Sequence, residues 1–150
     1  MDILNIAIYI VSLYLKKYGV IIDEMKLHKL LYFSQREYMV EYGEAMFQDE
    51  FEAWKYGPVM TIVRAIYPTI ANPNITVHPV PSRISTVIEK VFDLYSRKRS
   101  WNLSSLTHNE MSWQHAREGI PPSATIGRKM LTSDIIEDAN RVRLRRYLYS

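Results

Sequence analysis

The 150-residue sequence contains no cysteine, only five glycines, and neither a glycine-rich phosphate loop nor a nucleophile elbow. The absence of cysteine excludes disulfides, thiolate metal sites and cysteine nucleophiles, and it suits a protein of the reducing cytoplasm. Scarce glycine together with eleven tyrosines favours a packed helical domain over one rich in loops. Because no repeat, low-complexity tract or linker interrupts the chain, we expect residues 1–150 to form a single domain.

The sequence also lacks an apolar run long enough to cross a membrane. Residues 3–15 are the most apolar stretch, but a spanning helix needs about 20 apolar residues, and Asn5 and Ser12 interrupt this shorter run. Asp2 stands where a signal peptide would carry positive charge. We therefore predict a buried helix that ends at Gly19, and no contact with a membrane.

Charge is unevenly distributed along the chain, although the net charge is only +3. Residues 1–81 carry nine acidic side chains and seven lysines or arginines, whereas residues 82–150 carry seven acidic side chains and twelve lysines or arginines. Such a division is typical of a protein with a charged partner or a charged self-contact. A homo-oligomer is therefore one alternative to a monomer.

The fold is expected to be organised around a helix over Glu24–Tyr42. Asp23 suits the N-cap of this helix, and Gly43 can adopt the left-handed conformation that ends it. Aliphatic and aromatic residues occupy most of its circumference, which is typical of a helix surrounded by other elements. We therefore predict a mainly α protein, a compact bundle of six to seven helices around this central segment.

Apolar spacing and capping signals predict the remaining elements. Further helices are expected over residues 59–67, 82–95, 101–106 and 109–118 and from Thr132 or Ser133 onward, with Asn109 as an N-cap. Gly57-Pro58 is expected to begin the first of these helices, and Pro68 to end it. Residues 126–131 are expected to be extended and to pair with residues 47–53, which would give one small two-stranded β element.

No set of residues points to catalysis. His108 and His115 are seven positions apart, but a cap at Asn109 would separate them, and no third ligand lies at metal-site spacing. We therefore interpret both histidines as structural and predict no enzyme activity, no cofactor and no metal. The alternative is an enzyme whose site assembles only in three dimensions, with His28 and His108 beside acidic groups.

Two surfaces are expected to contact a partner. On the central helix, apolar side chains alternate with charged ones along one row, which is typical of a docking strip. The members of this strip are Lys29, Phe33, Arg36 and Val40. The alternative is that another segment of the chain covers them.

The second surface, named here the acidic edge, consists of Asp49, Glu50 and Glu52. Neighbouring carboxylates in an extended segment point apart, which favours an interface over acid–base catalysis.

The end of the sequence is basic, with aromatic residues among the arginines. Its basic residues are Arg141, Arg143, Arg145 and Arg146. One interpretation is a nucleic-acid contact, which would show a steep salt dependence. The other is a terminal helix with an arginine-rich outer face and with Leu144, Tyr147 and Leu148 packed against the body of the protein.

Three blocks of sequence resemble one known family. They are the run from Lys26 to Tyr32, the run Phe51-Glu-Ala-Trp-Lys-Tyr-Gly-Pro-Val59, and Leu106-Thr-His108 followed by Trp113-Gln-His-Ala-Arg117. In order and spacing these blocks are similar to the Panacea domain, also known as the SocA-like or phage-associated GepA-like domain. Ser112 departs from the pattern, because the family often has proline before the tryptophan.

This resemblance implies a mainly helical antitoxin that neutralises a toxin protein by binding it. Neutralisation by occlusion and delivery of the toxin to a protease such as ClpXP are both known in the family, which carries no enzymatic activity. A nucleic-acid-binding module or a mobile-element protein of other activity is the alternative. The motif residues are expected to have structural roles, and they are Leu30, Tyr32, Trp54, Gly57, Pro58 and Trp113.

Overall fold

The computed structural model describes residues 1–150 and shows seven α-helices with one small antiparallel hairpin. In chain order the elements are α1 (Ile3–Tyr18), α2 (Glu24–Tyr42), β1 (Glu52–Trp54), β2 (Gly57–Val59), α3 (Thr61–Ile70), α4 (Ser82–Tyr95), α5 (Ser100–His108), α6 (Met111–Ala116) and α7 (Thr132–Leu148). This confirms the predicted mainly α fold with a two-stranded element. None of the seven helices has the length and apolar character needed to cross a bilayer.

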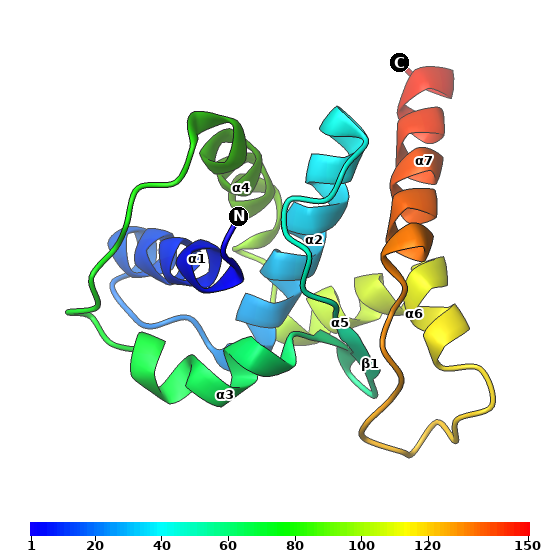
Figure 1. Ribbon diagram of the computed structural model, residues 1–150, viewed down its shortest axis with the longest axis horizontal. Helices are drawn as coiled ribbons and strands as arrows, with labels where there is room; N and C mark the ends of the chain where they lie inside the picture. Colours follow the sequence, from blue (N-terminus) through cyan, green and yellow to red (C-terminus); the bar gives the residue numbers. More distant parts are fainter.

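The α2 helix lies at the centre of the molecule, as its apolar pattern predicts. Figure 1 shows α1 and α4 on one side of it and α7 on the other, and α5 and the hairpin also pack against it. Its ends form as expected, since the Asp23 carboxylate accepts the Lys26 N–H at 2.8 Å and Gly43 takes a φ of 70°. Residues 26–39 are all buried. Most of α2 therefore has no face open to solvent.

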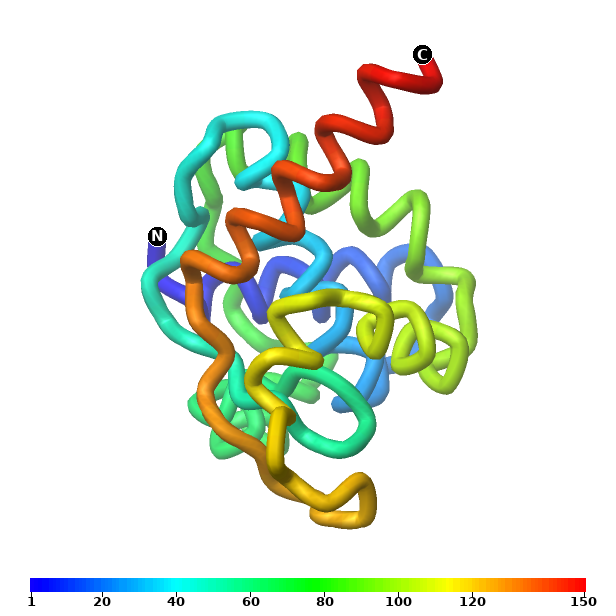
Figure 2. Tube along the Cα trace, turned by 90° about the vertical axis from the view of Figure 1, so that its right-hand side faces the viewer, coloured from blue at the N-terminus to red at the C-terminus, as the bar shows by residue number.

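The first helix is also confirmed as a buried element. It runs over Ile3–Tyr18 and ends at Gly19, which adopts the left-handed conformation at φ 73°. Its apolar side joins a continuous cluster of 30 buried hydrophobic residues that includes members of α2, α4 and α7. Figure 2 shows α7 crossing this body and its C-terminal end extending beyond it.

The predicted helix start at Gly57-Pro58 is wrong, because these residues form the second strand of the hairpin. Strand β2 pairs antiparallel with β1, and Trp54 lies opposite Gly57. Gly57 has a φ of 117°, which is incompatible with a helical turn. Residues other than glycine rarely adopt this φ. The helix α3 begins only at Thr61, after the strand has ended.

A third extended segment lies along the outer edge of β1. The Ala53 N–H donates to the Arg128 carbonyl at 2.8 Å, and the Met130 N–H donates to the Phe51 carbonyl at 2.7 Å. This confirms the expected pairing of the two regions, although it amounts to an isolated bridge beside the two-stranded sheet. Gly127 is required here, because a Cβ at this position would clash with the Ala53 carbonyl.

Two other predicted helix boundaries are wrong. The α3 helix continues through Pro68 to Ile70, and the Ala71 N–H still closes the last turn on the Tyr67 carbonyl at 2.8 Å. Pro68 lacks the N–H that would bond to the Arg64 carbonyl, so this helix loses one hydrogen bond, but it does not end there. Asn109 does not cap the next helix; it follows the end of α5, and its N–H bonds to carbonyls of that helix.

One buried carboxylate fastens α7 to the centre of the fold. Glu37 of α2 accepts two hydrogen bonds from the Arg146 guanidinium, at 2.8 and 2.9 Å, and lies 2.8 Å from the Lys90 amine of α4. Burial raises the pKa of Glu37, but the hydrogen bonds from Arg146 and Lys90 outweigh burial and hold this pKa below its usual value. The ion pairs of Glu37 therefore link α2 to both α4 and α7.

We expect Glu37→Gln to lower the free energy of unfolding by about 1 to 2 kcal/mol at neutral pH. Because the pKa of Glu37 is lower in the folded chain than in the unfolded chain, its contribution is complete above the unfolded pKa and disappears as the pH falls through the folded pKa. The wild type should therefore lose more stability on acidification than the variant does. Urea unfolding at a series of pH values measures this difference.

Glu44 provides the control for this experiment, since its carboxylate pairs with Arg83 at 2.8 Å on the exposed surface. Glu44→Gln should change the free energy of unfolding by less than about 0.5 kcal/mol, because water screens an exposed pair. Equal losses for the two variants would show that burial does not strengthen the contacts of Glu37.

Candidate functional site

The strip on α2 that the sequence predicts as a docking surface lies inside the protein. Lys29 and Phe33 are only 1% and 2% exposed, and Arg36 is also buried. The Phe33 ring stacks on Tyr95 of α4 with ring centroids 4.3 Å apart, and Arg36 forms an ion pair with Glu110. The prediction of an exposed strip is therefore wrong for these three residues, because α4 and the α5–α6 connection cover Phe33 and Arg36, and the hairpin covers Lys29.

Two of the four C-terminal arginines are engaged within the chain. Arg143 donates to the carbonyl oxygens of Met39 and Val40 at the end of α2, each at 2.8 Å. Arg146 forms the two hydrogen bonds with Glu37 described above. Val40, the fourth member of the predicted strip, is half-buried beside this contact. Arg143 and Arg146 thus stabilise the docking of α7, which weakens the case for a nucleic-acid surface built on all four arginines.

The opposite side of α7 is open to solvent. Leu144, Tyr147 and Leu148 are 57%, 79% and 62% exposed, so the interpretation that packs them against the body is wrong. Arg141 and Arg145 are exposed beside them. Positions 141, 144, 145 and 148 follow the three- and four-residue spacing that places side chains on one side of a helix. We name Arg141, Leu144, Arg145, Tyr147 and Leu148 the free face of α7.

The acidic edge remains partly exposed. Asp49 and Glu50 lie in solvent, and Glu50 has one distant ion pair, with the Lys129 amine 4.0 Å away. Glu52 is half-buried, because its carboxylate accepts the indole N–H of Trp54 at 2.9 Å. A partner could therefore meet Asp49 and Glu50 directly, whereas Glu52 serves the hairpin.

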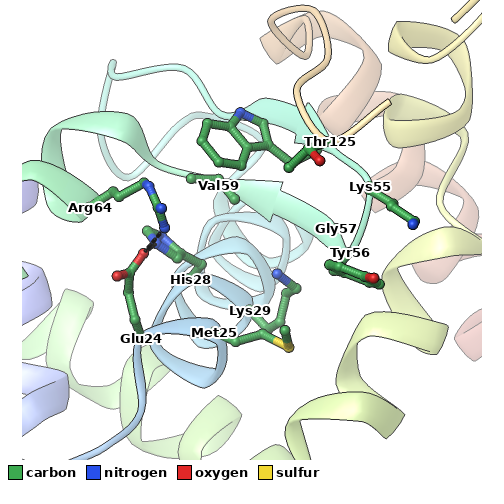
Figure 3. A pocket seen from close by; sticks show the side chains of 11 residues that line it. Glu24, Met25, His28, Lys29, Lys55, Tyr56, Gly57, Val59, Arg64 and Thr125 are labelled. Carbon is green, nitrogen blue, oxygen red and sulfur yellow. Dashed lines mark hydrogen bonds and ion pairs between the residues drawn. The ribbon is translucent and has the colours of Figure 1, made fainter. Parts of the chain in front are cut away.

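A cavity of about 280 Å³ opens between α2, the hairpin and α3, and Figure 3 shows it from close by. Its apolar lining comes from both strands of the hairpin and from α2. The residues that line it are Glu24, Met25, His28, Lys29, Trp54, Lys55, Tyr56, Gly57, Val59, Arg64 and Thr125. The sequence does not place these residues together, since they come from four separate segments.

One side of the cavity holds a chain of polar contacts, which the dashed lines in Figure 3 mark. The Glu24 carboxylate lies 3.0 Å from Nε2 of His28 and accepts a hydrogen bond from Arg64 at 2.8 Å. Nδ1 of His28 accepts the Met60 N–H at 3.2 Å. Burial lowers the pKa of His28 to about 4 despite its bond to Glu24, so the ring is neutral. Both ring nitrogens are occupied, which leaves no free base at this position.

Lys29 approaches the same cavity from its floor. In Figure 3 its side chain extends from α2 towards the hairpin, where Nζ donates to the Pro58 carbonyl at 3.3 Å. Burial lowers the pKa of this amine to about 8, and Asp23 and Glu24 offset only part of that effect. The docking strip predicted from the sequence includes Lys29 as an exposed residue. In the structure the side chain of Lys29 is buried and its amine lies at the cavity.

A second hollow, of about 470 Å³, lies on the neighbouring surface around Trp101, His108 and Trp113. The His108 ring stacks on Trp113 with ring centroids 4.1 Å apart. His115 lies on α6 instead and meets Asp134 of α7 at 2.6 Å. The two histidines therefore belong to separate contacts and do not converge.

Residues 27–114 match the family described as "Antitoxin SocA-like, Panacea domain". The chain belongs to this family. A curated relative, antitoxin SocA of Caulobacter vibrioides (strain NA1000 / CB15N), is 43% identical over 42 residues, which are 28% of this chain and 22% of the relative. The chain thus matches about a fifth of that relative's length, and no solved structure matches it.

The Panacea-domain match includes α2 from Leu27 onward and the hairpin, but it leaves out α7. One contact of the motif residues joins two of the blocks, and another joins a block to α7. The indole N–H of Trp113 donates to the Trp54 carbonyl at 2.9 Å, and the Tyr32 hydroxyl lies 3.2 Å from a carboxylate oxygen of Asp138. Leu30 and Pro58 are buried. These contacts fit the structural roles that the resemblance implies.

Proposed function

We propose that this chain is the antitoxin of a toxin–antitoxin pair and that it neutralises its toxin by direct protein–protein binding. Membership of the SocA-like Panacea family is the observation that carries this proposal, because it supports an antitoxin role. In this proposal residues 1–150 act as one domain in the cytoplasm. By the first route, the bound chain neutralises the toxin by occluding it, and this alone is sufficient. By the second route, the same complex delivers the toxin to a protease such as ClpXP.

In this proposal the toxin binds the free face of α7, whose apolar side chains are exposed. Monomeric proteins seldom leave several large apolar side chains together on one exposed helix, and such a patch is typical of an interaction site. An amphipathic helix that enters a groove presents apolar anchors at this spacing. Because Arg141 and Arg145 flank Leu144 and Leu148, the complementary groove on the toxin is apolar with an acidic rim. The acidic edge would contribute a second contact of opposite charge.

The double variant Leu144→Glu/Leu148→Glu is expected to abolish protection from the toxin. Both side chains are exposed, so the change should leave the unfolding temperature nearly unchanged. Loss of two central apolar anchors should weaken toxin binding by about 100-fold or more. Growth during co-expression with the product of the adjacent gene, and calorimetric titration of the two purified proteins, measure these effects.

Leu94→Glu is the matched control, since Leu94 is an equally exposed leucine on α4. It should retain full protection and full affinity. If the α7 double variant also protects fully, the free face is not the toxin surface. If the adjacent gene is harmless when expressed alone, the antitoxin proposal itself fails.

A further inference from the structure

The amine of Lys29 is poorly compensated for a buried cation. An ammonium group has three N–H donors, and Lys29 uses one of them, in a 3.3 Å hydrogen bond to the neutral Pro58 carbonyl. Its side chain is almost wholly buried. A buried charge is costly unless a counter-charge and further hydrogen bonds accompany it. The fold alone gives no reason for a lysine here, because an apolar side chain of the same length would fill the same space.

The charges that line the cavity leave it positive. Lys29, Lys55 and Arg64 carry positive charge, and Glu24 is the single acidic residue of the lining. Glu24 is already committed, since it accepts from Arg64 at 2.8 Å and from His28. Asp23, which lies outside the lining, caps α2 and accepts a hydrogen bond from Ser100 at 3.0 Å. Neither carboxylate pairs with the Lys29 amine, whose one hydrogen bond goes to the Pro58 carbonyl.

The walls of the cavity suit a small apolar group. Met25, Trp54, Tyr56 and Val59 line it, and the Arg64 guanidinium lies 5.1 Å from the centre of the Trp54 ring. A volume of about 280 Å³ lies just below the usual range for ligand sites. The space therefore suits one side chain or one small aromatic molecule, and not a nucleotide.

We propose that this cavity binds a carboxylate attached to a small aromatic or aliphatic group, with the carboxylate on the Lys29 amine and the apolar part against Trp54 and Met25. A free aromatic acid and the C-terminal residue of a partner protein share this chemistry. The proposal does not depend on antitoxin function, since binding is measured on the isolated chain. Lys29 and Trp54 lie within the Panacea-domain match, whereas Met25 lies just before it.

Phenylpropionate and its uncharged amide, phenylpropanamide, are the probes for this proposal. Titration of the isotope-labelled chain, followed by NMR, should show that the acid binds about 10- to 100-fold more tightly than the amide, as expected for a charge-assisted hydrogen bond. The affinity of the acid should fall as the pH rises through about 8, where the Lys29 amine loses its proton. This comparison needs no variant, so it stands even where a substitution impairs folding.

Lys29→Met keeps the length of the side chain and removes its charge. We expect it to abolish both the preference for the acid and its pH dependence, and to raise the unfolding temperature, because an uncompensated buried charge is lost. Lys98→Met, which alters an exposed lysine after α4, should change none of these properties. A structural lysine would give the opposite result, with lower stability and unchanged binding.

A phenylalanine-terminated peptide distinguishes the two sources of the carboxylate. Tighter binding of this peptide than of phenylpropionate, with loss on amidation, would identify the terminus of a partner chain. Weaker binding would identify a free acid, and either result supports a carboxylate site. Equal affinity for acid and amide, undiminished binding by Lys29→Met, or no binding of any probe at millimolar concentration would overturn the proposal.

Discussion

Asp138→Ala is expected to lower the free energy of unfolding by about 3 to 5 kcal/mol, because two buried donors and one partly buried donor would lose this acceptor at once. The Asp138 carboxylate on α7 is buried and accepts the N–H groups of Met111 and Ser112, each at 3.1 Å. It also accepts the Tyr32 hydroxyl at 3.2 Å. Since Met111 and Ser112 open α6, the carboxylate caps that helix from another element and meets the positive end of its dipole.

Two milder variants test this explanation of the Asp138 effect by urea unfolding. Asp138→Asn keeps one acceptor oxygen and should cost roughly half as much as alanine. Tyr32→Phe removes a single donor and should cost about 1 kcal/mol. If Asp138→Ala costs no more than Tyr32→Phe, then the cap on α6 contributes little and the explanation is wrong.

This cap also shows which parts of the fold could not be predicted from the sequence. The ends of α2 were predictable because Asp23 and Gly43 act on backbone groups within a few residues of themselves. The start of α6 depends on Asp138, which is 27 residues away from Met111 in the chain. Local pattern therefore assigned the cap to Asn109, a neighbouring residue of the right type, and the assignment was wrong.

The same limit explains the errors at the candidate surfaces. Apolar spacing shows that Phe33 and Leu144 each lie on an apolar row, but it does not show what lies opposite. Tyr95 covers Phe33, whereas nothing in the chain covers Leu144, because α7 extends past the body. Phe33, which was expected to be exposed, is therefore buried, and Leu144, which was expected to be packed, is exposed. The sequence carried no comparable signal for the cavity, because its lining comes from four separate segments.

Gly57 also belongs to this cavity, and Gly57→Ala is expected to lower the free energy of unfolding by about 3 to 5 kcal/mol. Its φ of 117° is strained for any residue with a side chain. A Cβ at this position would also lie 2.5 Å from Cε of Lys29 and 2.6 Å from Oγ1 of Thr107. Thr107 is buried and its Oγ1 donates to the Ser104 carbonyl at 2.7 Å, whereas the end of the Lys29 side chain can shift only by entering the cavity.

Gly43→Ala separates the two contributions to the cost at Gly57. Gly43 has a φ of 70° at the end of α2, but a Cβ there would have no neighbour within 4 Å. This control should cost only about 1 kcal/mol, which is the strain of the left-handed conformation alone. The excess loss at Gly57, measured by urea unfolding, then reports the close approach of the hairpin to Lys29. Equal losses would mean that the hairpin can move away from α2, and that the floor of the cavity is not held in place by Gly57.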